Sequence, residues 1–284
     1  MASTEALLEA PLAPGDLDAA EGLVAEAGWN QDRADWQIFL DLGRALAVKD
    51  DRGRLAATAA TLPYAGGFGW ISMVLVTSAF RRRGIATRLL GRCIDLLRGE
   101  GRVPVLDATP AGREVYRPLG FRDGWPITRW RKVGSTKKVL PTMAREIGEE
   151  DWSGVLALDA GAFGCDRSAL LARLRERSSA FACAVRREGR VRGFLLGRRG
   201  RVATQLGPIV AEDEADAIDL AAHAVARVPS PVIVDVLDRH QRLAAWLASQ
   251  GFERERPYTR MTLGRDAPFG DPRRLAAIAG PELG

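Results

Sequence analysis

The stretch VLVTSAFRRRGIATRLL, residues 74–90, is the part of the chain that best indicates its fold. Its first three residues are apolar, which is typical of the end of a buried strand, and Leu89, Leu90, Ile94 and Leu97 recur at helical spacing. An arginine-rich turn with a single glycine, Gly84, joins the two segments. The pattern predicts a strand, a sharp turn and a helix that begins directly after the glycine.

This turn has the chemistry of an anion site. The first amides of a helix lack an intrahelical acceptor, and the helix dipole favours negative charge beside them. Gly84 has no Cβ, so the backbone can come close to a ligand. The side chains of Arg81, Arg82 and Arg83 add positive charge. We therefore expect a diphosphate here, and the alternative is a basic loop that caps an ordinary helix.

A second motif follows downstream. VPVL, residues 103–106, predicts the next buried strand, and DATPAGREVYRPLGF, residues 107–121, comes directly after it. Within this run Tyr116 stands four residues before Gly120-Phe121. The R-x-x-G-x-A of residues 81–86 and this Y-x-x-x-G-F, in that order, resemble the two motifs of the GNAT N-acetyltransferase superfamily.

The resemblance implies a cofactor site and a catalytic residue. Acetyl-CoA is the implied co-substrate, and its pantetheine lies between a splayed fourth and fifth strand in that family. Tyr116 is implied to protonate the leaving thiolate, whereas its alternative role is to pack on the sheet. The residues assigned to the cofactor are Val74, Leu75, Val76, Arg81, Arg82, Arg83, Gly84, Ile85, Ala86 and Thr87.

The second half of the chain repeats the first in outline. Asp235 in VIVDV lies 128 residues after Asp107, and Gly251-Phe252 lies 131 residues after Gly120-Phe121. Near-constant offsets in the same order predict a duplicated fold. The second copy has AEDEADAI where the first has FRRRGIA, and Leu247 stands in place of the tyrosine. Acidic residues would repel a diphosphate, so we expect the second copy to be degenerate.

These patterns predict an α/β fold class with mixed α+β sheets, and the resemblance implies that it is built as a tandem GNAT fold. We expect a GNAT acetyltransferase domain that binds acetyl-CoA at residues 1–136. A degenerate GNAT-like domain on the acceptor side is expected at residues 137–284, after a polar linker at 133–140. This organisation resembles the YitH-type group of two-domain acetyltransferases.

The acceptor side carries weaker signals. Asp107 is expected to act as general base or amine anchor, or alternatively to cap the helix that follows it. Trp29, Asn30 and Trp36 fall in the region that covers the acceptor pocket in the family, and Tyr64 could also line it. Two tryptophans could hold a cationic amine, although core packing is their alternative role. The two histidines, His223 and His240, belong to the second half.

Composition limits the remaining choices. The net charge is +5, but the arginines are spread along the chain, which argues against a nucleic-acid partner. Three distant cysteines predict no metal, and the sequence predicts neither a membrane segment nor a signal peptide. We expect a cytoplasmic enzyme with a small-molecule amine acceptor, and we allow for a homodimer. The alternatives are a non-catalytic acyl-CoA sensor and a basic nucleic-acid-binding protein.

Overall fold

The computed structural model describes residues 7–134, 142–178 and 180–284. The chain divides into two compact units. The first unit comprises Met1–Pro63 and Gly67–Pro104, and the second comprises Tyr64–Gly66 and Val105–Gly284. The predicted domain boundary at residues 136–137, and most of the predicted linker, lie outside the described residues. The proposed domain limits therefore remain a prediction.

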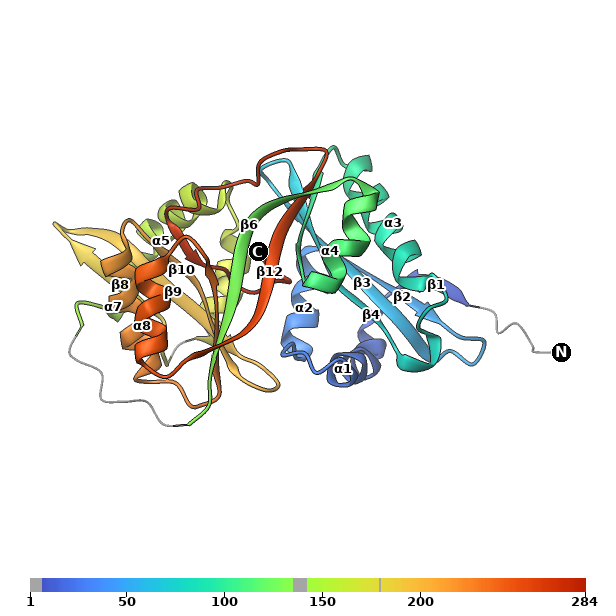
Figure 1. Cartoon of the computed structure of the whole chain (residues 1–284), viewed down its shortest axis with the longest axis horizontal. Helices are drawn as coiled ribbons and strands as arrows, with labels where there is room; N and C mark the ends of the chain where they lie inside the picture. Colours follow the sequence, from blue (N-terminus) through green and yellow to red (C-terminus); the bar gives the residue numbers. More distant parts are fainter. Residues whose placement is uncertain (1–6, 135–141, 179) are drawn as a thin grey trace. The chain divides into compact units, whose positions relative to one another are not determined.

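The first unit has the order of a strand, two helices, three strands and a helix (Figure 1). Short 3-10 turns precede α1 and α3, at Pro14–Asp16 and Ser78–Phe80. The strands follow the order β1-β2-β3-β4, and β2 is antiparallel to both β1 and β3. The bounds are β1 Leu8–Pro11, α1 Leu17–Glu26, α2 Arg33–Leu42, β2 Arg44–Lys49, β3 Leu55–Tyr64, β4 Phe68–Val76 and α3 Ile85–Gly99.

Helix α3 packs directly on β4. The predicted apolar face of α3 is buried, including Leu89, Leu90, Ile94 and Leu97. A Cβ on Gly69 of β4 would lie 2.3 Å from a methyl carbon of Leu97, so any other residue here would force the Leu97 side chain to move. The packing fixes the start of α3 relative to the end of β4, and therefore shapes the turn between them.

The second unit repeats this order of helices and strands, as expected for a duplicated fold. The second unit also contains the end of β5 together with α4 and β6, which are the last helix and the last strand of the first repeat. Its core is formed by apolar residues of α7, α8 and the surrounding strands. The bounds are β5 Val103–Ala108, α4 Pro110–Tyr116, β6 Phe121–Lys132, β7 Arg145–Glu146, α5 Glu149–Phe163, α6 Ser168–Arg177, β8 Cys183–Arg187, β9 Arg190–Arg199, β10 Thr204–Ala211, α7 Glu214–Val225, β11 Val232–Leu237, α8 Gln241–Ser249, β12 Glu253–Leu263 and β13 Leu275–Ala277.

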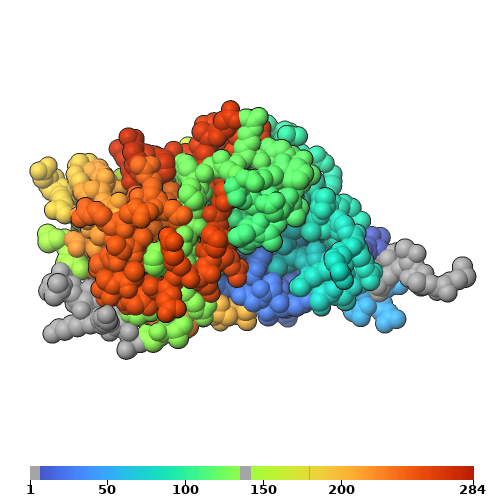
Figure 2. Space-filling model, viewed as in Figure 1, coloured from blue at the N-terminus to red at the C-terminus, as the bar shows by residue number. Residues whose placement is uncertain are grey.

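The two repeats exchange their last long strands. Strand β12, from the end of the chain, is antiparallel to β5 and β6, whereas β6 is antiparallel to β11. The strands β6 (green) and β12 (red-orange) run side by side in Figure 1. Green and red atoms of this region also meet on the surface shown in Figure 2. Each repeat is therefore completed by a strand of the other.

Strand β13 lies where β10 and β11 separate. These two strands are parallel and pair directly over residues 204–206 and 232–234. Beyond that point β13 is antiparallel to both, with Ala277 opposite Ile209 of β10 and Val236 of β11. The backbone of Gly207 comes so close that a Cβ there would lie 2.0 Å from the carbonyl oxygen of Ile278. The sequence patterns did not predict this strand.

Candidate functional site

The turn between β4 and α3 forms a cavity of about 350 Å³. Two residues of the turn have left-handed backbone, Arg82 with φ +60° and Gly84 with φ +74°. A left-handed conformation is strained for residues with a Cβ, which explains the glycine. The cavity is lined by Val74, Leu75, Val76, Phe80, Arg81, Arg82, Gly84, Ile85, Ala86 and Thr87.

The backbone amides of this turn are available to a ligand. In the part of the chain that the structure describes, the amides of residues 82–87 donate to no backbone or side-chain acceptor. The next amide, that of Arg88, donates to the carbonyl of Gly84 at 3.0 Å, so the helix is closed from there on. Six consecutive amides at a helix start, beside arginines, fit the diphosphate of an acyl-CoA.

The three arginines of the turn have different surroundings. The Arg81 guanidinium bonds to the carbonyl of Val76 and to Glu26. That of Arg83 lies over the Phe80 ring, 4.8 Å from its centre, and donates to the carbonyl of Ala79. Arg83 is the one predicted cofactor residue that does not line the cavity. Arg82, by contrast, is exposed and has no partner among the described residues.

Strand β4 carries a second backbone irregularity just before the cavity. The buried residue Met73 has φ +54°, and its carbonyl accepts a hydrogen bond from the Thr58 hydroxyl at 2.9 Å. A positive φ inside a strand is a local departure from regular strand geometry, as at a β-bulge. Met73 directly precedes Val74–Val76, the part of β4 that is predicted from the sequence to bind the cofactor.

Tyr116 ends helix α4 and is half-buried beside Phe121, with ring centres 5.9 Å apart. Its hydroxyl has no hydrogen-bond partner in the described residues. Burial raises the pKa of Tyr116 above its ordinary value, so the phenol keeps its proton at neutral pH. A protonated phenol without a fixed partner can act as a general acid.

Asp107 does not cap helix α4, because the N-cap is Thr109, whose hydroxyl accepts from the amide of Gly112. The buried Asp107 carboxylate instead accepts two hydrogen bonds from Arg260, both 2.9 Å long. Burial raises its pKa and Arg260 opposes that rise. The expectation of a free base here needs correction, since a carboxylate held on both oxygens by an arginine is an ion-pair anchor.

The four predicted acceptor residues have different surroundings. Trp36 is fully buried and meets Phe39 edge-on at 6.2 Å, so it packs in the core and offers no face to a ligand. Tyr64 is also buried, with its hydroxyl donating to the carbonyl of Leu283 at 2.6 Å. Asn30 is 3% exposed, and Trp29 is partly exposed. Trp29 alone among the four retains an accessible ring.

In the counterpart turn of the second repeat, acidic side chains bond to backbone amides and to an arginine. Asp213 caps α7 by accepting from the amide of Asp216 at 2.9 Å. Arg192 pairs with Glu212, Asp213 and Asp216 within 3.3 Å. Glu214 accepts from two amides at the start of α8. The acidic turn therefore serves the fold of this repeat.

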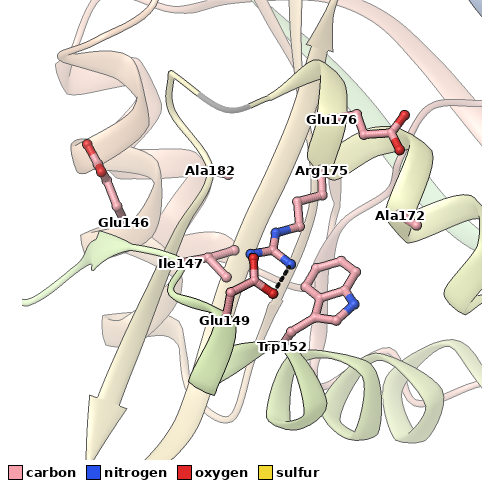
Figure 3. A pocket seen from close by; sticks show the side chains of 8 residues that line it. All are labelled: Glu146, Ile147, Glu149, Trp152, Ala172, Arg175, Glu176 and Ala182. Atoms are coloured by element: carbon pink, nitrogen blue, oxygen red, sulfur yellow. Dashed lines mark hydrogen bonds and ion pairs between the residues drawn. The ribbon is translucent and has the colours of Figure 1, made fainter.

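A second cavity, of about 450 Å³, lies in the second unit near the start of α5 (Figure 3). Its Trp152 ring is covered by the Arg175 guanidinium at 4.7 Å, and Arg175 pairs with Glu149 at 2.5 Å. Figure 3 shows Glu146 and Glu176 on the same cavity. The arginine is thus engaged with both the ring and a carboxylate.

The described residues contain neither a cluster of potential metal ligands nor a long apolar helix. None of their histidine, cysteine, aspartate and glutamate side chains gather in threes that could hold a metal ion. None of their helices is both long and apolar enough to span a membrane. His240 is buried, and its Nε2 lies 2.8 Å from the carbonyl oxygen of Pro272.

Comparison with known families identifies the class of protein. The model of the Acetyltransferase (GNAT) family matches residues 16–121, and that of the Acetyltransferase (GNAT) domain matches residues 155–275. The chain is therefore an enzyme of the GNAT family. Because each half matches separately, it belongs to the tandem GNAT proteins, as the sequence predicted. Proteins of this fold use acyl-CoA.

Three similar proteins span most of the chain. The uncharacterized N-acetyltransferase YitH of Bacillus subtilis is 24% identical over 236 residues, which cover 82% of this chain and 83% of that protein. The holothin acyltransferase of a Pseudoalteromonas species is 26% identical over 270 residues, which cover 93% of this chain and 90% of that protein. The crystal structure of a putative acetyltransferase from Pyrococcus horikoshii aligns with a TM-score of 0.79 and 20% sequence identity. The alignment covers 98% of this chain and 96% of that one.

Proposed function

We propose that this enzyme transfers the acetyl group of acetyl-CoA to the amine of a small molecule, directly within a ternary complex. The observation that supports this most is the run of six amides without acceptors at residues 82–87, next to the exposed Arg82. A diphosphate would satisfy these donors together. The neighbouring backbone of Val74–Val76, which lines the same cavity, would hold the pantetheine and acetyl carbonyl.

When bound, acetyl-CoA supplies a thioester whose acetyl carbon a neutral amine can attack. The C–N bond forms, the C–S bond breaks, and the sulfur leaves as a thiolate. The Tyr116 hydroxyl would donate its proton to that thiolate and regain one from water. The proton lost by the amine nitrogen passes to solvent water. Asp107 has no part in this sequence, because Arg260 holds both of its oxygens.

The cysteines support direct transfer. An acyl-enzyme intermediate would require a cysteine that ionises near neutral pH. Burial raises the pKa of Cys93 to about 12 and raises that of Cys165 and Cys183 as well. All three therefore remain thiols at neutral pH and are poor nucleophiles.

We also infer that one chain binds one acetyl-CoA, at the first repeat. Two independent features of the second repeat support this. Its counterpart turn is occupied by the acidic side chains of residues 212–216, and β13 fills the space between β10 and β11. By the resemblance, these are the places where the diphosphate and pantetheine of an acyl-CoA would lie.

The experiment combines the purified chain, acetyl-CoA and a panel of small amines, with release of free CoA measured by a thiol reagent. We expect release above background with at least one amine, and mass spectrometry should show the acetylated product. Binding of acetyl-CoA without transfer to any amine would favour the sensor alternative. Absence of acetyl-CoA binding would refute the proposed function altogether.

A further inference from the structure

Glu26, the last residue of α1, contacts the segment that leads into the turn. One carboxylate oxygen accepts a hydrogen bond from the backbone amide of Ser78 at 2.5 Å, and the other accepts from the Thr77 hydroxyl at 2.7 Å. These bonds lower the pKa of Glu26, which is therefore a carboxylate at neutral pH. Helix α1 is thus tied to the chain immediately after β4.

Arg81 connects the same carboxylate to the end of the strand. Its Nε donates to the carbonyl of Val76 at 3.0 Å, and one terminal nitrogen lies 3.3 Å from the Glu26 oxygen that also accepts from Ser78. The guanidinium therefore bridges the strand end and helix α1. The segment 76–81 is held at four points, immediately before the amides that are free to bind a ligand.

We propose that Glu26 is a positioning residue that holds the turn in its acyl-CoA-binding shape, acting through Ser78, Thr77 and Arg81. This inference rests on the proposed function of the turn. Arg81 then acts through its fixed contacts, and the exposed Arg82 is the arginine left to meet the phosphate charge. An exposed ion pair alone contributes little, so the bonds to Ser78 and Thr77 are the main contribution of Glu26.

Electrostatics and positioning predict opposite signs for the loss of Glu26. Removing a carboxylate near an anion site makes the local potential more positive, which by charge alone strengthens the binding of a diphosphate. If Glu26 instead orders the turn, its removal lets the six amides diverge and weakens binding. The sign of the change in Kd therefore separates the two roles.

The test measures the Kd of acetyl-CoA by calorimetry for the full chain, Glu26→Ala and Glu26→Gln. We expect Glu26→Ala to weaken binding about tenfold, which corresponds to roughly 1.4 kcal/mol. Glu26→Gln keeps an acceptor oxygen and should recover part of the loss. The KM for acetyl-CoA should rise in parallel, with kcat within about twofold of the original, as expected for lost binding that is common to ground and transition states.

Glu21→Ala is the matched control, because Glu21 lies on the same helix and has no partner among the described residues. It should leave the Kd unchanged. Tighter binding by Glu26→Ala, or binding as tight as the original, would overturn the inference while leaving the proposed function intact. A fall of kcat with unchanged KM would also overturn it. If the original chain binds no acyl-CoA, the proposed function fails first.

Discussion

Arg260 on β12 and Asp107 on β5 form a buried bidentate ion pair although they lie 153 residues apart in the sequence. The repeat contains a counterpart, in which Arg129 on β6 holds Asp235 on β11 at 2.7 and 2.8 Å. Each pair joins the last long strand of one repeat to the neighbouring strand of the other. Each of the two ion pairs therefore connects strands that are adjacent only because the repeats exchange strands.

Breaking one of these pairs should destabilise the whole protein. Arg260→Met leaves the Asp107 carboxylate buried without its partner, and such changes typically cost about 3–5 kcal/mol. Arg129→Met should have a similar effect through Asp235. Urea unfolding measures both. Arg273→Met is the control, since Arg273 is 75% exposed and its pair with Asp271 should contribute less than about 1 kcal/mol. Equal losses in all three variants would contradict the expectation.

The turn itself can be tested at its glycine. Gly84→Glu should abolish acetyl-CoA binding because it places a carboxylate where the diphosphate is expected. The left-handed backbone adds a cost of roughly 1–2 kcal/mol for any residue with a Cβ. Gly53→Glu controls for that strain, because Gly53 has φ +77° with open space around it, in the turn between β2 and β3. Calorimetry should show no binding for the first variant and native affinity for the second. Native affinity in Gly84→Glu would mean that the diphosphate lies elsewhere.

Tyr116→Phe removes the proposed proton donor and keeps the ring beside Phe121. General-acid assistance is typically worth about 100- to 10,000-fold, so we expect kcat to fall at least 100-fold with little change in the Kd of acetyl-CoA. Tyr258→Phe is the control for the loss of a phenol from a buried ring. An unchanged kcat, under conditions where chemistry limits the rate, would show that the thiolate leaves without this residue.

The sequence predicted those features that depend on local patterns. The turn at 81–87 could be located because a single glycine between an apolar run and a helical repeat has few structural solutions. The burial of Leu89, Leu90, Ile94 and Leu97 followed from their spacing in the same way. The duplication could be found because the offsets between its motifs are nearly constant.

The features that were missed depend on distant pairings. No local signal shows that Arg260 neutralises Asp107, so the aspartate could be mistaken for a base. Strand β13 follows a stretch without regular structure, and its pairing with β10 and β11 is set by tertiary packing. Because of the strand exchange, the sequence of the first repeat alone does not contain all the strands that complete it. A fragment that ends at residue 136 would lack β12 and Arg260. Glu26 gave no signal because it meets the turn only in the folded chain.

The thiols offer a test of direct transfer that needs no acceptor. Cys93 and Cys183 are buried and Cys165 is half-buried, and burial raises the pKa of each. A thiol with a raised pKa forms less thiolate at a given pH and reacts more slowly. In the native protein at pH 8, a disulfide reagent should therefore modify Cys165 first and slowly, and should reach Cys93 and Cys183 only after denaturation. Rapid modification of a native thiol would reopen the possibility of an acyl-enzyme.

Calorimetric titration of the full chain with acetyl-CoA should give a stoichiometry of one. The first repeat offers free amides and an exposed arginine. In the matching turn of the second, Asp213 accepts from the amide of Asp216 and pairs with Arg192. Between β10 and β11, the carbonyl of Ala279 is held by the buried Arg198 side chain at 2.6 Å, so the segment that fills this space is anchored. Gly84→Glu makes the test sharper, because it should remove the single site and leave a stoichiometry of zero. If this variant still bound one acetyl-CoA per chain, the second repeat would be the binding domain, and its acidic turn and inserted strand would have to be compatible with a cofactor.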